Sequence, residues 1–120
     1  MFTVTVEQTF TASHQLVTSK GTEELHSHDW VIAAAFKSKS LDSDGFAVDF
    51  EILKTILDQE CQKFVGGKIE DFEYFKNVSA TAENLAKYLF FSIKNQLNGP
   101  GKLEYVEVTE ATGCKAKYSE

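Results

Sequence analysis

The N-terminal residues alternate between hydrophobic and polar side chains, with the apolar residues of Phe2–Val6 separated by threonines. This period of two is typical of a β-strand with one buried face, so we expect a strand from Phe2 toward Phe10. A polar stretch, Thr18–Glu24, then interrupts the pattern and predicts a loop. Strand character returns over Leu25–Phe36, which has aromatic and β-branched residues at its centre.

Farther along the chain, apolar residues recur at a spacing of three and four, which predicts helices. The first helix follows the N-cap residue Asp49 and ends at Gly66-Gly67. Its expected apolar face consists of Ile52, Leu53, Ile56, Leu57 and Phe64. The second helix begins near Thr81 and ends at Asn98–Gly101, while the intervening Lys68–Val78 predicts irregular structure.

Two further strands are expected near the C-terminus, over residues 103–108 and 114–118. Strands that are not interleaved with helices favour an antiparallel sheet. We therefore expect an α+β fold in which two helices cover one face of a four-stranded antiparallel sheet, in the order β-β-α-α-β-β. The chain is long enough for one domain, residues 1–120, and an exposed sheet edge favours a homo-oligomer.

Composition narrows the classes of partner. The chain carries 12 lysines, no arginine and 18 acidic residues, which gives a net charge of −6 and argues against binding of nucleic acid or an anionic membrane. No apolar run approaches the ~20 residues of a membrane span. The two cysteines, Cys61 and Cys114, make no disulfide framework and are expected to be packing thiols. With no signal segment at the start of the chain, a cytoplasmic location is the default expectation.

The three histidines of the chain are the candidate chemistry. His26 and His28 are two residues apart in an expected strand, so their imidazoles project from the same face. His14 comes near them if the first two strands pair as a hairpin. Three imidazoles with a fourth position open to water or substrate make a catalytic zinc site, which Asp29 could help to orient. By itself the His-x-His pair favours ordinary exposed strand histidines, and the metal interpretation gains support because all three histidines fall within one expected hairpin.

Five segments, in order, resemble one enzyme family. They are Phe10–Leu16 (F-x-A-x-H-x-L), His26–His28 (H-G-H), Gly45–Phe50 (G-x-V-x-D-F), Thr81–Ala86 (T-A-E-N-L-A) and Val106–Glu110 (V-x-V-x-E). Together they are similar to the 6-pyruvoyltetrahydropterin synthase and 6-carboxytetrahydropterin synthase family, and the likeness runs over nearly the whole chain.

The resemblance implies the tunnelling fold (T-fold), assembled as a homo-oligomer that is a trimer or a hexamer. It implies a zinc ion held by His14, His26 and His28, and a small-molecule pterin substrate anchored by Glu110 with Thr81 near the ring. A carboxylate can accept two parallel hydrogen bonds from a pterin N–H and amine, as it does from arginine. Without the resemblance, Glu110 would be interpreted as a solvated acid at a strand end.

Three departures from the family pattern bear on the reaction. The cysteine that is the usual base is replaced by Thr22, but the neighbouring Glu23 resembles a branch of the family with glutamate in its place. That branch cleaves the pterin side chain to give 6-hydroxymethyl-7,8-dihydropterin. The Asp-His pair expected within Val65–Ile69 is absent, and Ser27 stands where the family has glycine.

These observations lead to a zinc-dependent lyase that acts on the side chain of 7,8-dihydroneopterin or its triphosphate. Retro-aldol cleavage needs one base, which Glu23 could supply. One alternative is a pterin-binding homologue that has lost turnover, which the missing Asp-His pair favours. Another is a conventional family activity that uses an unidentified base.

Overall fold

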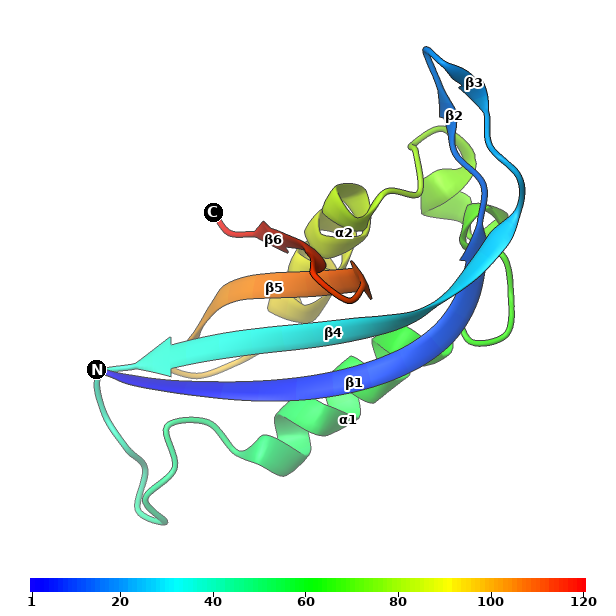
Figure 1. Cartoon of the computed structure of the whole chain (residues 1–120). Coiled ribbons are helices and arrows are strands. Elements are labelled where there is room, and N and C mark those ends of the chain that lie inside the picture. Colours follow the sequence, from blue (N-terminus) through cyan, green and yellow to red (C-terminus); the bar gives the residue numbers. More distant parts are fainter.

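A computed structural model describes all of residues 1–120. The main sheet has four antiparallel strands in the order β1-β4-β5-β6, and a separate two-stranded ribbon pairs β2 with β3 (Figure 1). The elements are β1 (Phe2–His14), β2 (Val17–Thr18), β3 (Gly21–Thr22), β4 (His26–Ser38), α1 (Phe50–Gln62), η1 (Ile69–Asp71), η2 (Glu73–Lys76), α2 (Ala82–Lys94), β5 (Lys102–Ala111) and β6 (Cys114–Tyr118). The α+β prediction with its β-β-α-α-β-β order is confirmed for the main sheet.

The two long strands, β1 and β4, have 13 residues each and curve together beyond the helices (Figure 1). Alternate residues of the strands face α1 and α2 and form the core. From β1 these are Val6, Phe10 and Ala12; from β4, Trp30, Ile32, Ala34 and Phe36; from β5, Val106 and Val108. Burial of these side chains, at about 25 cal/mol per Å² of apolar surface, is the main stabilising contribution to the fold.

α1 begins at the predicted cap Asp49, and α2 begins after Thr81, where its start was predicted. The Asp49 carboxylate accepts from the Glu51 N–H at 2.9 Å, and the Thr81 hydroxyl accepts from the Asn84 N–H at 3.1 Å. Each bond satisfies one N–H that has no partner within the helix. α1 packs on β1, whereas α2 packs on β5 and β6, so the two helices lie on the same face of the sheet.

The structure corrects four details of the predicted elements. The Thr18–Glu24 stretch is not only a loop, because the β2–β3 ribbon forms around Gly21, whose φ is +113°. The irregular segment contains the 3₁₀ helices η1 and η2. Ile52 is 56% exposed and so does not belong to the buried face of α1. α2 ends at Lys94, four residues before Asn98.

The helices of this chain are too short and too polar to include one that could cross a membrane.

Candidate metal centre

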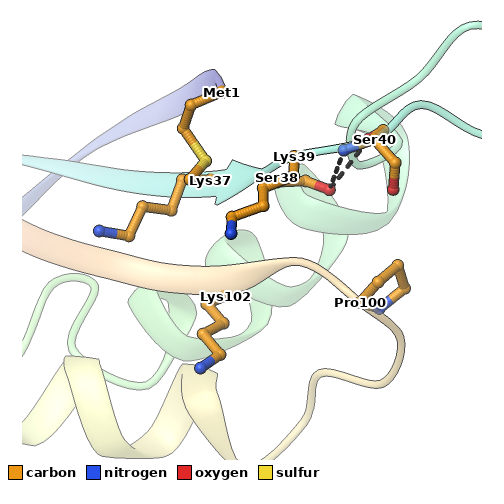
Figure 2. Close-up of a pocket in the computed structure, with 7 residues that line it drawn as sticks. All are labelled: Met1, Lys37, Ser38, Lys39, Ser40, Pro100 and Lys102. Atoms are coloured by element: carbon orange, nitrogen blue, oxygen red, sulfur yellow. Dashed lines mark hydrogen bonds between the residues drawn. The ribbon is translucent and has the colours of Figure 1, made fainter.

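The β1–β4 pair has two chemically different ends. At one end, where Phe2 pairs with Ser38, a cavity of about 340 Å³ opens beside the lysines of β4 and β5 (Figure 2). Its lining residues are Met1, Lys37, Ser38, Lys39, Ser40, Pro100 and Lys102. They include no imidazole, thiol or carboxylate, so this end has none of the usual side-chain ligands of a zinc ion.

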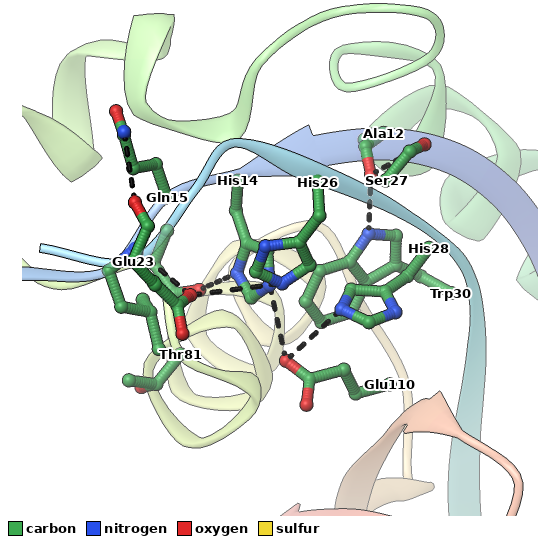
Figure 3. Close-up of polar contacts among 12 residues, drawn as sticks. Ala12, His14, Gln15, Glu23, His26, Ser27, His28, Trp30, Thr81 and Glu110 are labelled. Carbon is green, nitrogen blue, oxygen red and sulfur yellow. Dashed lines mark hydrogen bonds and ion pairs between the residues drawn. The ribbon is translucent and has the colours of Figure 1, made fainter.

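The other end of the pair gathers all three histidines. His14 is directly opposite His26 in the strand register, and His28 is opposite Ala12, so the expected hairpin pairing is confirmed. The histidines continue the core-facing rows of Phe10–Ala12 and Trp30–Phe36 to the point where the helices no longer cover the sheet. Their rings converge, with one nitrogen of each within 4.8 Å of the others (Figure 3).

Backbone carbonyls determine which ring nitrogen is free in two of the histidines. His14 Nδ1 lies 2.8 Å from the Ala80 carbonyl oxygen, and His26 Nδ1 lies 2.7 Å from the Glu24 carbonyl oxygen. A carbonyl oxygen only accepts, so Nδ1 carries a hydrogen in both rings, and in the neutral form of each ring Nε2 presents the lone pair. The two Nε2 atoms are nevertheless only 2.9 Å apart. Two lone pairs at that distance repel unless a proton or a metal cation lies between them.

The environment of His28 favours a metal ion, and not a proton, between the imidazoles. His28 Nε2 is buried and has no hydrogen-bond partner. Burial lowers the pKa of His28, against the opposing effect of the Glu110 charge, so its neutral form with an available lone pair is favoured. A single proton bridges two nitrogens, whereas three convergent imidazoles suit a divalent ion. The three residues therefore fit the metal site that was predicted from their spacing.

Trp30 supports the cluster from beneath and was not recognised from the sequence as a site residue. Its ring is fully buried and makes edge contacts with His14 and His28, at centroid distances of 5.0 and 5.3 Å. The signal was present, because Trp30 follows His28 by two residues and so lies on the same face of the strand.

Two carboxylates approach the histidines from different elements. Glu23, just after β3, places Oε1 3.7 Å from His26 Nε2. Glu110, near the end of β5, places Oε1 3.4 Å from His14 Nε2 and 3.9 Å from His28 Nε2. Figure 3 shows both side chains directed at the cluster. The structure thus brings together five of the six predicted site residues.

Glu23 is held in its orientation by the backbone of Leu16. The Leu16 N–H donates to Glu23 Oε1 at 3.1 Å, and the Glu23 N–H donates to the Leu16 carbonyl at 3.0 Å. Gln15 adds a third bond from its side-chain amide to the Glu23 carbonyl. The carboxylate is therefore turned toward the histidines although 41% of the side chain is exposed.

Thr81, the sixth predicted site residue, is the N-cap of α2, and its hydroxyl is engaged with Asn84. Asp29 does not orient a histidine, because its carboxylate accepts from the Thr11 hydroxyl at 2.6 Å on the other face of the sheet. The carbonyls of Ala80 and Glu24 perform that task instead. Ser27 fits without strain, since no residue other than glycine has a positive φ.

The two cysteines lie in different environments. Cys61 is buried in α1, as expected for a packing thiol, and burial raises its pKa to about 12. The same expectation is wrong for Cys114, which is exposed at the start of β6. Cys114 and Glu110 both line a cavity of about 340 Å³, together with Ala82, Glu83, Lys115, Ala116 and Lys117. None of the histidines lines this cavity, and Glu110 is the one predicted site residue that does.

The segment aligned with the absent Asp-His pair is a turn that packs on β1. The Gly66 N–H donates to the Thr11 carbonyl, and the Ser13 N–H donates to the Gly67 carbonyl, both at 2.9 Å. Neither glycine brings a titratable side chain to the cluster. Nearby, Glu70 accepts from the Gln15 N–H at 2.8 Å and so supports the strand beside His14.

Comparisons with known proteins agree with the fold. A model of the 6-pyruvoyl tetrahydropterin synthase family matches residues 3–120. The Caenorhabditis elegans 6-pyruvoyl tetrahydropterin synthase structure superposes with a TM-score of 0.85 at 24% identity, covering 100% of this chain and 97% of that one. The Plasmodium falciparum enzyme gives a TM-score of 0.80 at 18% identity, over 99% and 97% of the two chains.

A third similar structure is a Plasmodium vivax 6-pyruvoyltetrahydropterin synthase with a glutamate-to-alanine substitution, described as a catalytic residue mutant. It has a TM-score of 0.80 and 17% identity, and the match covers 99% of this chain and 97% of that one. No match was found among curated proteins. The fold is the T-fold of these structures, and from the match over residues 3–120 the chain belongs to the 6-pyruvoyl tetrahydropterin synthase family.

Proposed function

We propose that this chain, as one domain of residues 1–120, is a zinc-dependent lyase that cleaves the side chain of 7,8-dihydroneopterin or its triphosphate. The observation that carries the proposal is the position of Glu23, whose Oε1 is 3.7 Å from His26 Nε2 beside three convergent imidazoles. A hydroxyl of the pterin side chain that binds the metal would need a base beside it, and the Glu23 carboxylate is directed at that position.

His14, His26 and His28 would hold the zinc ion. When bound, the ion supplies Lewis acidity, which lowers the pKa of a coordinated hydroxyl. The chain fixes the ligand geometry through its own carbonyls, because Nδ1–H bonds to Ala80 and Glu24 direct both Nε2 lone pairs inward.

Glu23 would remove the proton from the hydroxyl on the second side-chain carbon. The O–H electron pair then forms the carbonyl of the departing aldehyde, and the bond between the first and second side-chain carbons breaks. The electrons of the broken carbon–carbon bond pass into the conjugated C6=N5 imine of the dihydropterin. Protonation of the first side-chain carbon then restores the imine. The products are 6-hydroxymethyl-7,8-dihydropterin and glycolaldehyde or its triphosphate. The cleavage involves no net oxidation or reduction, so it needs no redox partner.

Glu110 would anchor the pterin ring by accepting from its N–H and amino groups. Its carboxylate borders both the histidines and a cavity of about 340 Å³, which supports a ring beside the metal. Thr81 would border the ring from the start of α2. The Thr81 hydroxyl accepts from the Asn84 N–H, and this bond fixes Thr81 at the start of α2.

A glutamate as base has a parallel in the Plasmodium vivax relative, in which a glutamate is described as catalytic. Elimination of triphosphate with tautomerisation would need further acid–base groups. The family supplies them from a cysteine and an Asp-His pair, and here Thr22, Val65 and Gly66 provide neither.

A pterin-binding homologue without turnover is the second candidate. It is favoured by Val65 and Gly66 at the Asp-His position, which leave the cluster with the carboxylates of Glu23 and Glu110 and without the acid–base pair of the family. A conventional family activity through an unidentified base is the third. We also propose a homo-oligomer, since β1 and β6 are the unpaired edges of the sheet.

Turnover separates these candidates. Zinc-loaded protein is incubated with 7,8-dihydroneopterin or its triphosphate, and the pterins are resolved by chromatography. We expect 6-hydroxymethyl-7,8-dihydropterin, lost in Glu23→Gln and retained in Glu7→Gln, an exposed position at mid-strand in β1. Pterin binding without product would favour the binding homologue, and a different product would favour a conventional activity.

A further inference from the structure

We infer that Glu110 is the fourth ligand of the metal in the absence of pterin, so that the resting site is closed. This inference rests on the proposed metal site, but not on the proposed reaction. Glu110 would thus have a role in the protein without bound pterin, before any contact with a substrate.

The contact between Glu110 and His14 points to a cation. The Nδ1 atom of His14 faces the Ala80 carbonyl oxygen, so Nε2 is the ring nitrogen directed at the cluster. Glu110 Oε1 lies 3.4 Å from this nitrogen. Adjacent ligand atoms around a tetrahedral zinc ion are separated by roughly 3.3 Å, given metal–ligand bonds of about 2.0–2.1 Å. Glu110 is therefore at the distance of a neighbouring ligand.

The same oxygen is also near a second histidine. It lies 3.9 Å from His28 Nε2, the buried nitrogen that has no other partner. Glu23, in contrast, is within ion-pair distance of His26 alone, and its Oε1 already accepts from the Leu16 N–H. The Glu110 carboxylate has no hydrogen-bond donor from the protein, although Lys115 and Lys117 line the same cavity. It is thus the freer and better placed of the two carboxylates.

The backbone of β5 explains how Glu110 reaches the histidines. The pairing of β5 with β6 shifts register between Thr109 and Ala111, which makes Glu110 the extra residue of a β-bulge. Glu110 follows Val106 and Val108 at the strand spacing of two, so it lies on the core-facing side of β5. On this side its carboxylate approaches His28, near the start of β4.

Closure by Glu110 has a consequence for ligand entry. A Glu110 oxygen cannot bind the metal while the same carboxylate anchors a pterin ring in the cavity. Binding of the ring would therefore remove Glu110 from the metal. The fourth coordination position would then be open to the side chain of the bound pterin. In the protein without pterin, an added anion would compete with Glu110 for the fourth coordination position of the metal.

Azide binding to the cobalt-substituted protein tests this inference without any turnover. Co²⁺ is loaded into the full-length chain, and azide is titrated while the visible d–d bands are recorded. We expect the unsubstituted protein to resist azide and Glu110→Gln to bind it about tenfold more tightly or better, since a vacated metal position accepts a small ligand. Equal azide affinity in the two proteins would overturn the inference.

Two controls separate ligation from charge and from folding. Glu23→Gln removes a carboxylate from the same cluster but is expected to leave azide affinity within about twofold, because a nearby charge acts more weakly than a lost ligand. Glu104→Gln, on the same strand, tests for general damage to β5. In Glu110→Ala, added acetate should restore the cobalt spectrum of the unsubstituted protein, and a failure to restore it contradicts ligation.

The pterin arm uses 6-methyl-7,8-dihydropterin, which has the ring but no hydroxyl to bind the metal. It should raise azide affinity in the unsubstituted protein and leave Glu110→Gln unchanged, whereas no effect on the unsubstituted protein contradicts withdrawal by the ring. A chain that takes up no Co²⁺ contradicts the metal site and the inference together. Metal uptake with readily bound azide contradicts only the inference.

Discussion

The Trp30 indole donates its Nε1–H to the Ala12 carbonyl at 3.1 Å, across the pair of strands that carry the histidines. The bond ties β4 to β1 two residues from His14 and two from His28. It also fixes the ring on which both imidazoles rest. A core residue and the geometry of the metal site are thereby connected.

Trp30→Phe tests this connection. The variant keeps an aromatic ring but leaves the buried Ala12 carbonyl without the indole donor, and it opens space beneath the imidazoles. We expect a loss of about 1–3 kcal/mol in unfolding free energy and metal affinity weaker by about tenfold or more. Urea unfolding of the metal-free protein and competition with a chromophoric chelator measure the two effects separately. Unchanged metal affinity would show that Trp30 has only a packing role.

Metal removal should loosen the end of the sheet where the histidines meet. Without a cation, the bare Nε2 atoms of His14 and His26 face each other at 2.9 Å. We expect zinc to raise the thermal midpoint in a concentration-dependent manner, because a ligand that binds only the folded state stabilises it. Calorimetry before and after chelation measures the shift, and His28→Ala should abolish most of it. A midpoint indifferent to zinc contradicts the prediction.

The buried carboxylate of Glu60 should be a stabilising link between α1 and α2. It is 3% exposed and accepts from Lys63 Nζ at 3.1 Å, from the Ser92 hydroxyl and from the Gln96 amide. Glu60→Ala leaves these donors unpaired and creates a cavity, so we expect a loss of about 2–4 kcal/mol. Chemical denaturation measures it, with exposed Glu73→Ala as the control.

Stability at alkaline pH should depend on Cys61. Burial, assisted by the charges of Asp58 and Glu60, raises the pKa of its thiol to about 12. An unfolded thiol ionises from about pH 8.5, so the unfolded state binds fewer protons above that pH. The unfolding free energy should therefore fall by about 1 kcal/mol per pH unit between roughly pH 9 and 12, relative to Cys61→Ala.

Alkylation provides a second measurement on the same thiol. At pH 8, iodoacetamide should modify Cys114, which is exposed, and should reach Cys61 only after unfolding. Mass spectrometry of digested protein locates the label. Native-state labelling of Cys61 would contradict its burial.

Periodicity and cap chemistry were sufficient to predict most of the fold. The structure contains the alternation in β1, the Asp49 cap, a second helix that begins after Thr81 and the short strand 114–118, all as expected. Ile52 was misplaced because it sits at the edge of the apolar stripe, near the start of α1, where the helix faces solvent. The β2–β3 ribbon was missed because two-residue strands give no period to detect.

The candidate site could be predicted only in part. The three histidines were found from their spacing, and Glu23 and Glu110 from a resemblance to a family. The carbonyls of Ala80 and Glu24 that orient the imidazoles could not be predicted, since every residue has a carbonyl and tertiary structure selects which one serves. The β-bulge at Glu110 could not be predicted either, because it depends on the pairing of β5 with β6.

The decisive measurement is the metal content and coordination of protein purified without chelators and reconstituted with zinc. X-ray absorption together with elemental analysis should give one zinc per chain, bound by three imidazole nitrogens and one oxygen, and His14→Ala should lose it. Protein that remains folded but holds no stoichiometric divalent cation after reconstitution would contradict the proposed centre.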